Sequence, residues 1–125
     1  MATARSRITK GRNFQKRVML KIKEVFQLTD EDIRTPIGAE AGTDIRLSKK
    51  AQEIVGLSCE CKNMKNMNIW TALEQAKKNC DKGCVEAVIF KRGDLGANKE
   101  YICVPLEHYL ELRKYKVDWE RTLEE

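Results

Sequence analysis

One short segment of the chain carries acidic and basic side chains at a spacing that suits catalysis. Glu60 and Lys62 stand two residues apart, so on a β-strand they would project from the same face. Asp44 follows the small-residue loop 38–42 and opens another segment with an extended pattern. If these segments lie side by side, two carboxylates and one ammonium converge on one point. Such a group could hold a divalent cation beside a phosphodiester and activate water against it.

The side chains suggest a division of roles. Asp44 and Glu60 are natural ligands for a hard cation such as Mg²⁺ or Mn²⁺, and the backbone carbonyl of Cys61 could add a third oxygen. Lys62 would polarise the water or steady the phosphate, and its charge would offset the repulsion between the carboxylates. A surface ion pair on an exposed strand has the same Glu-x-Lys spacing. The glycine-containing loop before Asp44 and the apolar strand before Glu60 favour the catalytic interpretation.

Length and composition limit the classes of protein to consider. The chain has 125 residues, 42% of them hydrophobic and 34% charged, which fits one compact domain. A net charge of +5 is compatible with a polyanion partner such as nucleic acid. No apolar run approaches the ~20 residues of a membrane span, and the N-terminus lacks the apolar core of a secretory signal. We therefore expect no membrane association and a cytoplasmic location.

The five cysteines raise the question of a zinc site. Cys59, Cys61, Cys80 and Cys84 have Cys-x-Cys and Cys-x3-Cys spacings, which differ from the usual Cys-x2-Cys knuckle. A cytoplasmic chain with an odd number of cysteines is expected to keep them reduced. We favour buried, small apolar thiols over a zinc site.

The periodicity of the apolar residues predicts a single α/β domain over residues 10–115, with a mixed sheet flanked by helices. A basic arm is expected over 1–9 and a charged tail over 116–125. The expected elements are a helix over 11–28, a short edge strand at 33–37, a strand over 43–47, a Ser48-capped turn over 49–53, a strand over 54–62, a helix over 69–78, strands over 85–91 and 101–104, and a helix from Pro105 to about Tyr115.

Three motifs together resemble a known family. They are Gly-Thr-Asp-Ile at 42–45, an apolar strand ending in Glu-Cys-Lys-Asn at 60–63, and the helix 68–76 with Trp70 and Gln75. The pattern resembles the PD-(D/E)XK nuclease superfamily over about residues 11–113. It is closest to the small phage-type members that are similar to Holliday junction resolvases.

The resemblance implies a metal-dependent DNA endonuclease with a restriction-endonuclease-like αβββαβ core. It assigns metal ligation to Asp44 and Glu60 and the catalytic lysine role to Lys62. It also gives Gln75 a supporting role, although a solvated amide on a helix surface is the alternative. For a phage-type protein, the expected location is the cytoplasm of the bacterial host.

The chain departs from the resolvase-like pattern on the first helix. Such members often carry a glutamate after an aromatic residue, whereas here Phe14 is followed by Gln15. Gln15 helps without charge, or Glu24 or Glu40 supplies a carboxylate, or that ligand is missing. Thr43 also replaces the usual proline before the aspartate.

Basic residues around the first helix are candidate DNA contacts. Lys10, Arg12, Lys16 and Arg17 would bind phosphates without reading bases, although any one of them could simply be solvated. We expect structure-selective cleavage of branched DNA, such as a recombination junction, by a homodimer whose symmetry suits that of the junction. The alternatives are a non-catalytic DNA-binding module with the nuclease fold, or a basic scaffold protein with a coincidental Glu-x-Lys.

Overall fold

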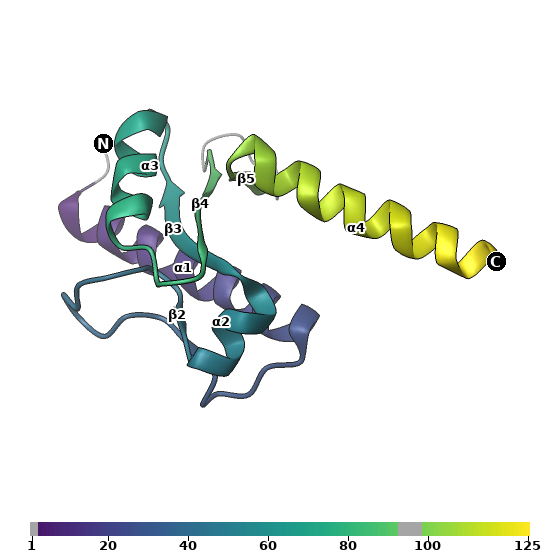
Figure 1. Cartoon of the computed structure of the whole chain (residues 1–125). Helices are drawn as coiled ribbons and strands as arrows, with labels where there is room; N and C mark the ends of the chain where they lie inside the picture. Colours follow the sequence, from purple (N-terminus) through teal and green to yellow (C-terminus); the bar gives the residue numbers. More distant parts are fainter. Residues whose placement is uncertain (1–2, 93–98) are drawn as a thin grey trace.

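The computed structural model describes residues 3–92 and 99–125 (Figure 1). This part of the chain is a small mixed α/β domain, as the sequence predicts. Its elements in chain order are α1 (Ala4–Phe26), β1 (Ile33–Arg34), β2 (Arg46–Leu47), α2 (Lys49–Val55), β3 (Leu57–Asn63), α3 (Ile69–Lys78), β4 (Val85–Lys91), β5 (Tyr101–Cys103) and α4 (Leu106–Glu124). None of the helices described has the length and apolarity needed to cross a membrane.

The central sheet has the order β3-β4-β5 and mixed strand directions. β3 and β4 are parallel and pair from Leu57 opposite Val85 to Asn63 opposite Lys91. Parallel strands need a long crossover connection, which α3 provides. β5 is antiparallel to β4, and β1 and β2 form a separate short antiparallel ladder. β3 is therefore an edge strand of the central sheet.

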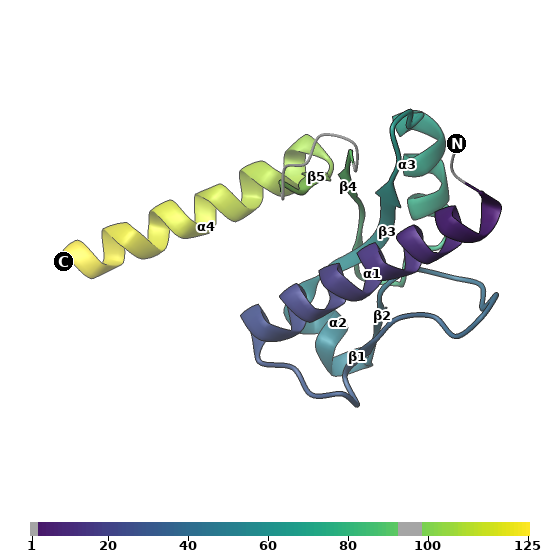
Figure 2. The ribbon, with the colours of Figure 1, turned by 180° about the vertical axis from the view of Figure 1, so that it is seen from behind.

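Helix α1 covers one face of this sheet. Its buried residues Phe14 and Val18 pack in one core cluster with Cys59 and Cys61 of β3. In a strand, alternate side chains point to opposite faces, so Glu60 points away from α1. Figure 2 shows α1 lying across the sheet.

Helix α3 covers the opposite face. Ala72 and Ala76 pack there against Val88 of β4, which stands opposite Glu60 in the ladder. Asn68 caps α3, because its Oδ1 accepts the backbone N–H groups of Trp70 and Thr71 at 3.0 and 3.2 Å. Sheet and helices thus form three layers, and the Glu60 side of β3 faces the α3 layer.

Two terminal segments differ from the sequence-based expectations. Residues 4–9 belong to α1 rather than to an arm, because Oγ1 of Thr3 accepts the N–H of Ser6 at 3.1 Å and caps the helix. The first two residues of the expected arm lie outside the described residues. At the other end, α4 continues to Glu124, so residues 116–124 are helical rather than an irregular tail.

The two strands that were expected to carry Asp44 and Glu60 are shorter than the sequence predicts. α2 extends to Val55 and ends at Gly56, whose left-handed backbone (φ 71°) lets its N–H bond to the carbonyl of Gln52. β3 therefore begins at Leu57 instead of at residue 54. The strand expected over 43–47 is limited to Arg46 and Leu47, so Asp44 lies in the loop before β2.

The α1 interface can be tested with two phenylalanines on the same helix. Phe14→Ala removes a side chain that is 3% exposed and should lower the free energy of unfolding by about 3–5 kcal/mol. Phe26→Ala removes one that is 41% exposed and should cost about 1 kcal/mol or less. Urea unfolding measures both values. Equal losses would show that α1 does not dock through Phe14.

Candidate active site

Asp44 is held at the outer edge of β3 by two hydrogen bonds to backbone groups of that strand. Its own N–H donates to the carbonyl of Cys59 at 2.9 Å, and the N–H of Cys61 donates to its Oδ2 at 2.7 Å. Both β3 residues present their backbone groups at the edge that β4 leaves open. The loop before β2 thereby holds a carboxylate directly beside the strand that carries Glu60.

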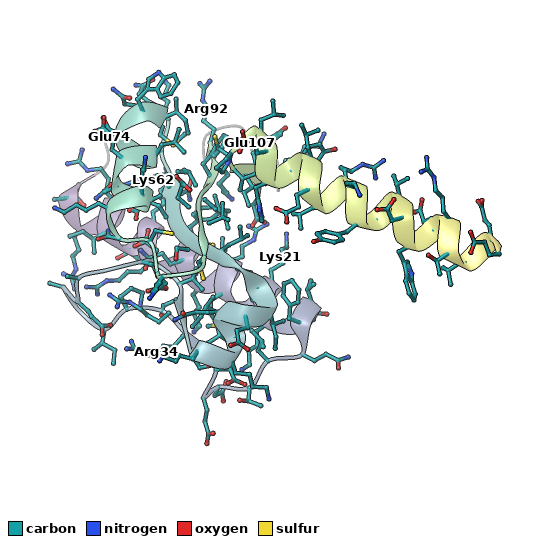
Figure 3. The ribbon with its side chains drawn as sticks, in the orientation of Figure 1. Lys21, Arg34, Lys62, Glu74, Arg92 and Glu107 are labelled. Atoms are coloured by element: carbon teal, nitrogen blue, oxygen red, sulfur yellow. The ribbon has the colours of Figure 1, made fainter. Side chains whose placement is uncertain are left out.

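Glu60 and Lys62 meet Asp44 at this edge. The Glu60 residue is 5% exposed, and its side chain is hydrogen bonded to that of Asp44. Nζ of Lys62 lies 3.5 Å from Oε1 of Glu60, with 26% of the lysine side chain exposed. Figure 3 shows Lys62 on the α3 side of the sheet. The structure thus brings together the three charged residues that the sequence singled out.

Gln15 reaches the same point from α1. Its neighbour Phe14 is buried in the core, which fixes this turn of the helix against β3. The Gln15 side chain lies close enough to the Asp44 carboxylate to lower its pKa, which an amide N–H directed at the carboxylate would do. Rotation of the amide would present its oxygen instead. The first helix therefore supplies a neutral group to the acidic pair.

The two carboxylates resist ionising together. Burial raises the pKa of Asp44 and that of Glu60, the latter to about 7, and the charge of Asp44 raises the pKa of Glu60 further. Lys62 acts in the opposite direction on both groups. Near neutral pH Glu60 is therefore partly protonated beside Asp44. A bound cation would favour loss of that proton.

The oxygen atoms available to a cation come from few residues. Besides Asp44 and Glu60 there is the amide of Gln15, and the carbonyl of Cys61 points to the same strand edge as its N–H. Within residues 3–92 and 99–125, no cluster of three or more His, Cys, Asp and Glu side chains is suited to a metal ion. A hard cation at this point would rest on two carboxylates and neutral oxygens, a set that fits Mg²⁺ or Mn²⁺.

The alternative carboxylates on other elements do not join this pair. Glu40 forms a bidentate ion pair with Arg34, with nitrogen–oxygen distances of 2.9 and 3.0 Å, and also accepts a hydrogen bond from the N–H of Ile37. These bonds lower the pKa of Glu40 to about 2. Glu24 lies on an exposed part of α1, about two and a half turns beyond Gln15. Among the candidates for the first-helix position, Gln15 is the residue that contacts Asp44.

Gln75 lies apart from the acidic pair. It is exposed on α3, whereas Ala72 and Ala76 form the face of that helix that packs on the sheet. Among the described residues, its side chain makes no hydrogen bond to Asp44, Glu60 or Lys62. Its supporting role therefore stays a prediction from the resemblance.

The cysteines of β3 belong to the core. Cys59 is 1% exposed and Cys61 is 8% exposed, and both pack with α1. Burial raises the pKa of Cys59 to about 12 and that of Cys61 well above its ordinary value. Their thiols therefore stay protonated and serve as small apolar groups.

A basic groove of about 610 Å³ lies between the N-terminal half of α1 and the ends of β3 and β4. Asn63 and Phe14 line it, so the groove lies on the α1 side of the end of β3, whereas Glu60 and Lys62 point to the other face of that strand. None of the described lining residues is acidic. The lining consists of Thr3, Arg5, Ser6, Thr9, Lys10, Asn13, Phe14, Arg17, Asn63 and Lys91.

The predicted DNA contacts divide between this groove and the outer surface of α1. Lys10 and Arg17 line the groove, and Arg17 also forms an ion pair with Glu100 at 3.2 Å. Arg12 and Lys16 are exposed on α1 outside the lining. The groove thus contains two of the four expected phosphate contacts.

Sequence reasoning missed Lys91 and the polar stripe on the first turns of α1. Lys91 stands opposite Asn63 at the shared end of two parallel strands, so the strand pairing places it beside Asn63 in the lining of the groove. Ser6, Lys10, Asn13 and Arg17 recur at spacings of four and three residues, the period of one helix face. Extending the helix through residues 4–9 would have revealed this stripe.

Comparisons with protein-family models, with curated proteins and with solved structures give no match. The function is therefore inferred from the geometry of the site. That geometry comprises a buried carboxylate pair, an adjacent lysine, a glutamine amide and a basic groove.

The raised pKa of Glu60 has a consequence for stability. Its folded value of about 7 lies above its ordinary value of 4.5, so ionisation costs the folded protein stability as pH rises between those values. Glu60→Gln removes this cost. It should raise the melting temperature of the metal-free protein at pH 8 relative to the wild type, and the difference should vanish by pH 4. The exposed Glu74→Gln serves as control. An equal effect at both pH values would contradict the buried pair.

Proposed function

We propose that this protein is a divalent-metal-dependent endonuclease that hydrolyses phosphodiester bonds in DNA. The observation that carries the proposal is the convergence of side chains from α1, the β1–β2 loop and β3 on one point. These side chains belong to Gln15, Asp44, Glu60 and Lys62. The chain order α1, β1, β2, β3, α3, β4 also follows the αβββαβ core that the resemblance implies, with α2 inserted before β3.

The buried carboxylate pair supports a cation site. Burial raises the pKa of both acids, and the charge of Asp44 raises that of Glu60 further, so a dication bound between them would favour the ionised form of both. Asp44 and Glu60 would hold Mg²⁺ or Mn²⁺, with neutral oxygens from Gln15 and Cys61. When bound, the cation would supply an activated water and stabilise charge on the phosphate.

Lys62 would act on the substrate. Its ammonium is 3.5 Å from Glu60 and partly exposed, so it can contact both the acidic pair and a phosphate that approaches from solvent. It keeps Glu60 more ionised than burial alone would allow, since its charge lowers the pKa of that carboxyl. It also provides a donor for a phosphate oxygen beside the water. Both effects require the lysine on the same strand face as Glu60.

The basic groove between α1 and the ends of β3 and β4 supports a nucleic acid substrate. Arg5, Lys10, Arg17 and Lys91 line it together with hydroxyl and amide groups, which suits a chain of phosphates. Such contacts position a duplex without reading its bases. We therefore infer selection by DNA shape, with branched DNA such as a Holliday junction as the substrate class.

A cleavage assay tests the proposal. The wild type should cut four-way junctions, flaps, linear duplexes or single strands in the presence of Mg²⁺ or Mn²⁺, and chelation should stop the reaction. Asp44→Ala, Glu60→Ala and Lys62→Ala should each lower the rate at least ~10²-fold while circular dichroism shows a folded protein. Lys65→Ala, an exposed lysine in the loop after β3, is the control and should cut at the wild-type rate.

Two outcomes would count against catalysis. If Glu60→Ala or Lys62→Ala cuts at the wild-type rate, the assigned site is wrong. If the wild type binds DNA but cuts none of these substrates with either metal, the chain is a non-catalytic DNA-binding module. The neutral Gln15 favours this second candidate, because it leaves the acidic pair with one carboxylate fewer than resolvase-like members often have.

Gln15 provides a separate test of the metal site. Gln15→Glu adds a third carboxylate beside Asp44, which should lower the melting temperature of the metal-free protein at pH 8. The same change should lower the Mg²⁺ concentration needed for half-maximal thermal stabilisation. Gln15→Ala, the matched control, should raise that concentration or leave it unchanged. Identical Mg²⁺ titrations for the wild type and Gln15→Glu would exclude a cation next to Gln15.

A further inference from the structure

Helix α4 lacks a partner within the described chain. It spans Leu106–Glu124, about 28 Å at 1.5 Å per residue, and none of its residues is buried. It projects away from the body in both views of the ribbon (Figures 1 and 2), and its side chains extend outward along its length (Figure 3). In proteins, most of the stability of a helix comes from packing of one of its faces, which α4 does not have within the described chain.

Local interactions contribute little to α4. Pro105 begins the helix without a side-chain cap hydrogen bond. The ion pairs Lys114–Asp118 and Lys116–Glu120 span 3.0 and 4.0 Å and are exposed, so each contributes little to the stability of the helix. A stable α4 therefore calls for a surface that covers it.

One side of α4 carries an apolar stripe. Leu112, Tyr115, Trp119 and Leu123 recur at spacings of three, four and four residues, and each is at least 53% exposed. Leu112, Tyr115 and Trp119 occupy successive a, d and a positions of a heptad, the seam through which two helices pair. Tyrosine and tryptophan are also among the side chains most enriched as anchors of protein interfaces.

The charges beside the stripe indicate which partner fits. With Leu112 at position a, Glu111 and Asp118 occupy g positions and Lys116 occupies an e position. In a parallel pair of helices each g residue meets the e residue five positions later on the other helix. Glu111 therefore faces the partner's Lys116, and this contact occurs twice by symmetry. An antiparallel pair would place g residues against g residues, which are acidic here.

We propose that α4 pairs in parallel with α4 of a second copy of this chain and that the apolar stripe forms the dimer interface. The Lys116–Glu120 contact within one helix is exposed and long, so Lys116 can turn to the partner's Glu111 at little cost. The inference rests on α4 alone and does not depend on the proposed nuclease activity. It gives the dimer a defined surface distant in sequence from the acidic pair.

Analytical ultracentrifugation of the full chain over a range of concentrations tests the interface. The wild type should be dimeric, and Trp119→Glu should weaken the dimer at least ~10-fold. Leu110→Glu, a leucine 53% exposed on the opposite side of α4, should leave association unchanged. Both variants should keep the wild-type melting temperature of the body. A wild type that stays monomeric at every concentration, or equal weakening by the two variants, would overturn the proposal.

A charge exchange tests the parallel orientation. Glu111→Lys should weaken the dimer, since it places two lysines opposite each other, and Lys116→Glu should weaken it by placing two glutamates there. The double variant with both changes should restore the wild-type dissociation constant. If the double variant remains as weak as the single ones, the parallel pairing is wrong.

Discussion

The candidate site depends on the bond from the N–H of Cys61 to the Asp44 carboxylate at the edge of β3. An unpaired strand edge leaves donors and acceptors that must find partners when they are buried. Asp44 satisfies one of each, the N–H of Cys61 and the carbonyl of Cys59. The contacts that complete the strand edge therefore also press an acidic side chain against Glu60. The hydrogen bonds of Asp44 with Cys59 and Cys61 thus both satisfy the strand edge and position the carboxylate of the candidate site.

Placing two carboxylates in a buried position costs stability, and the surrounding layers have to offset that cost. Burial raises the pKa of both Asp44 and Glu60, while Lys62, the Gln15 amide and the Cys61 N–H act against that rise. Such opposed effects on a pKa are typical of functional sites, where groups are held in protonation states that they would not adopt in water. The core beneath β3, with α1 on one face and α3 on the other, keeps the pair in place.

Helix α1 connects the core, the site and the groove. Its period of 3.6 residues directs Phe14 and Val18 into the core, while Lys10 and Arg17 line the groove. Gln15, one step from Phe14, lies between these two faces and contacts Asp44. A substitution that shifts α1 would therefore change stability, site electrostatics and groove shape together. α4 lacks such connections, which suits a role in contacts between molecules.

Local patterns in the sequence were enough to predict the features that depend on residues close together in the chain. Strand alternation gave the shared face of Glu60 and Lys62, and the expected helix over 69–78 and strand over 85–91 have the observed bounds. The tertiary structure alone decided three other relations. These are the contact of Gln15 with Asp44, the ion pair between Glu40 and Arg34, and the exposure of Gln75. These relations join residues that only packing brings together, and a one-dimensional pattern does not encode the distance between side chains on different elements.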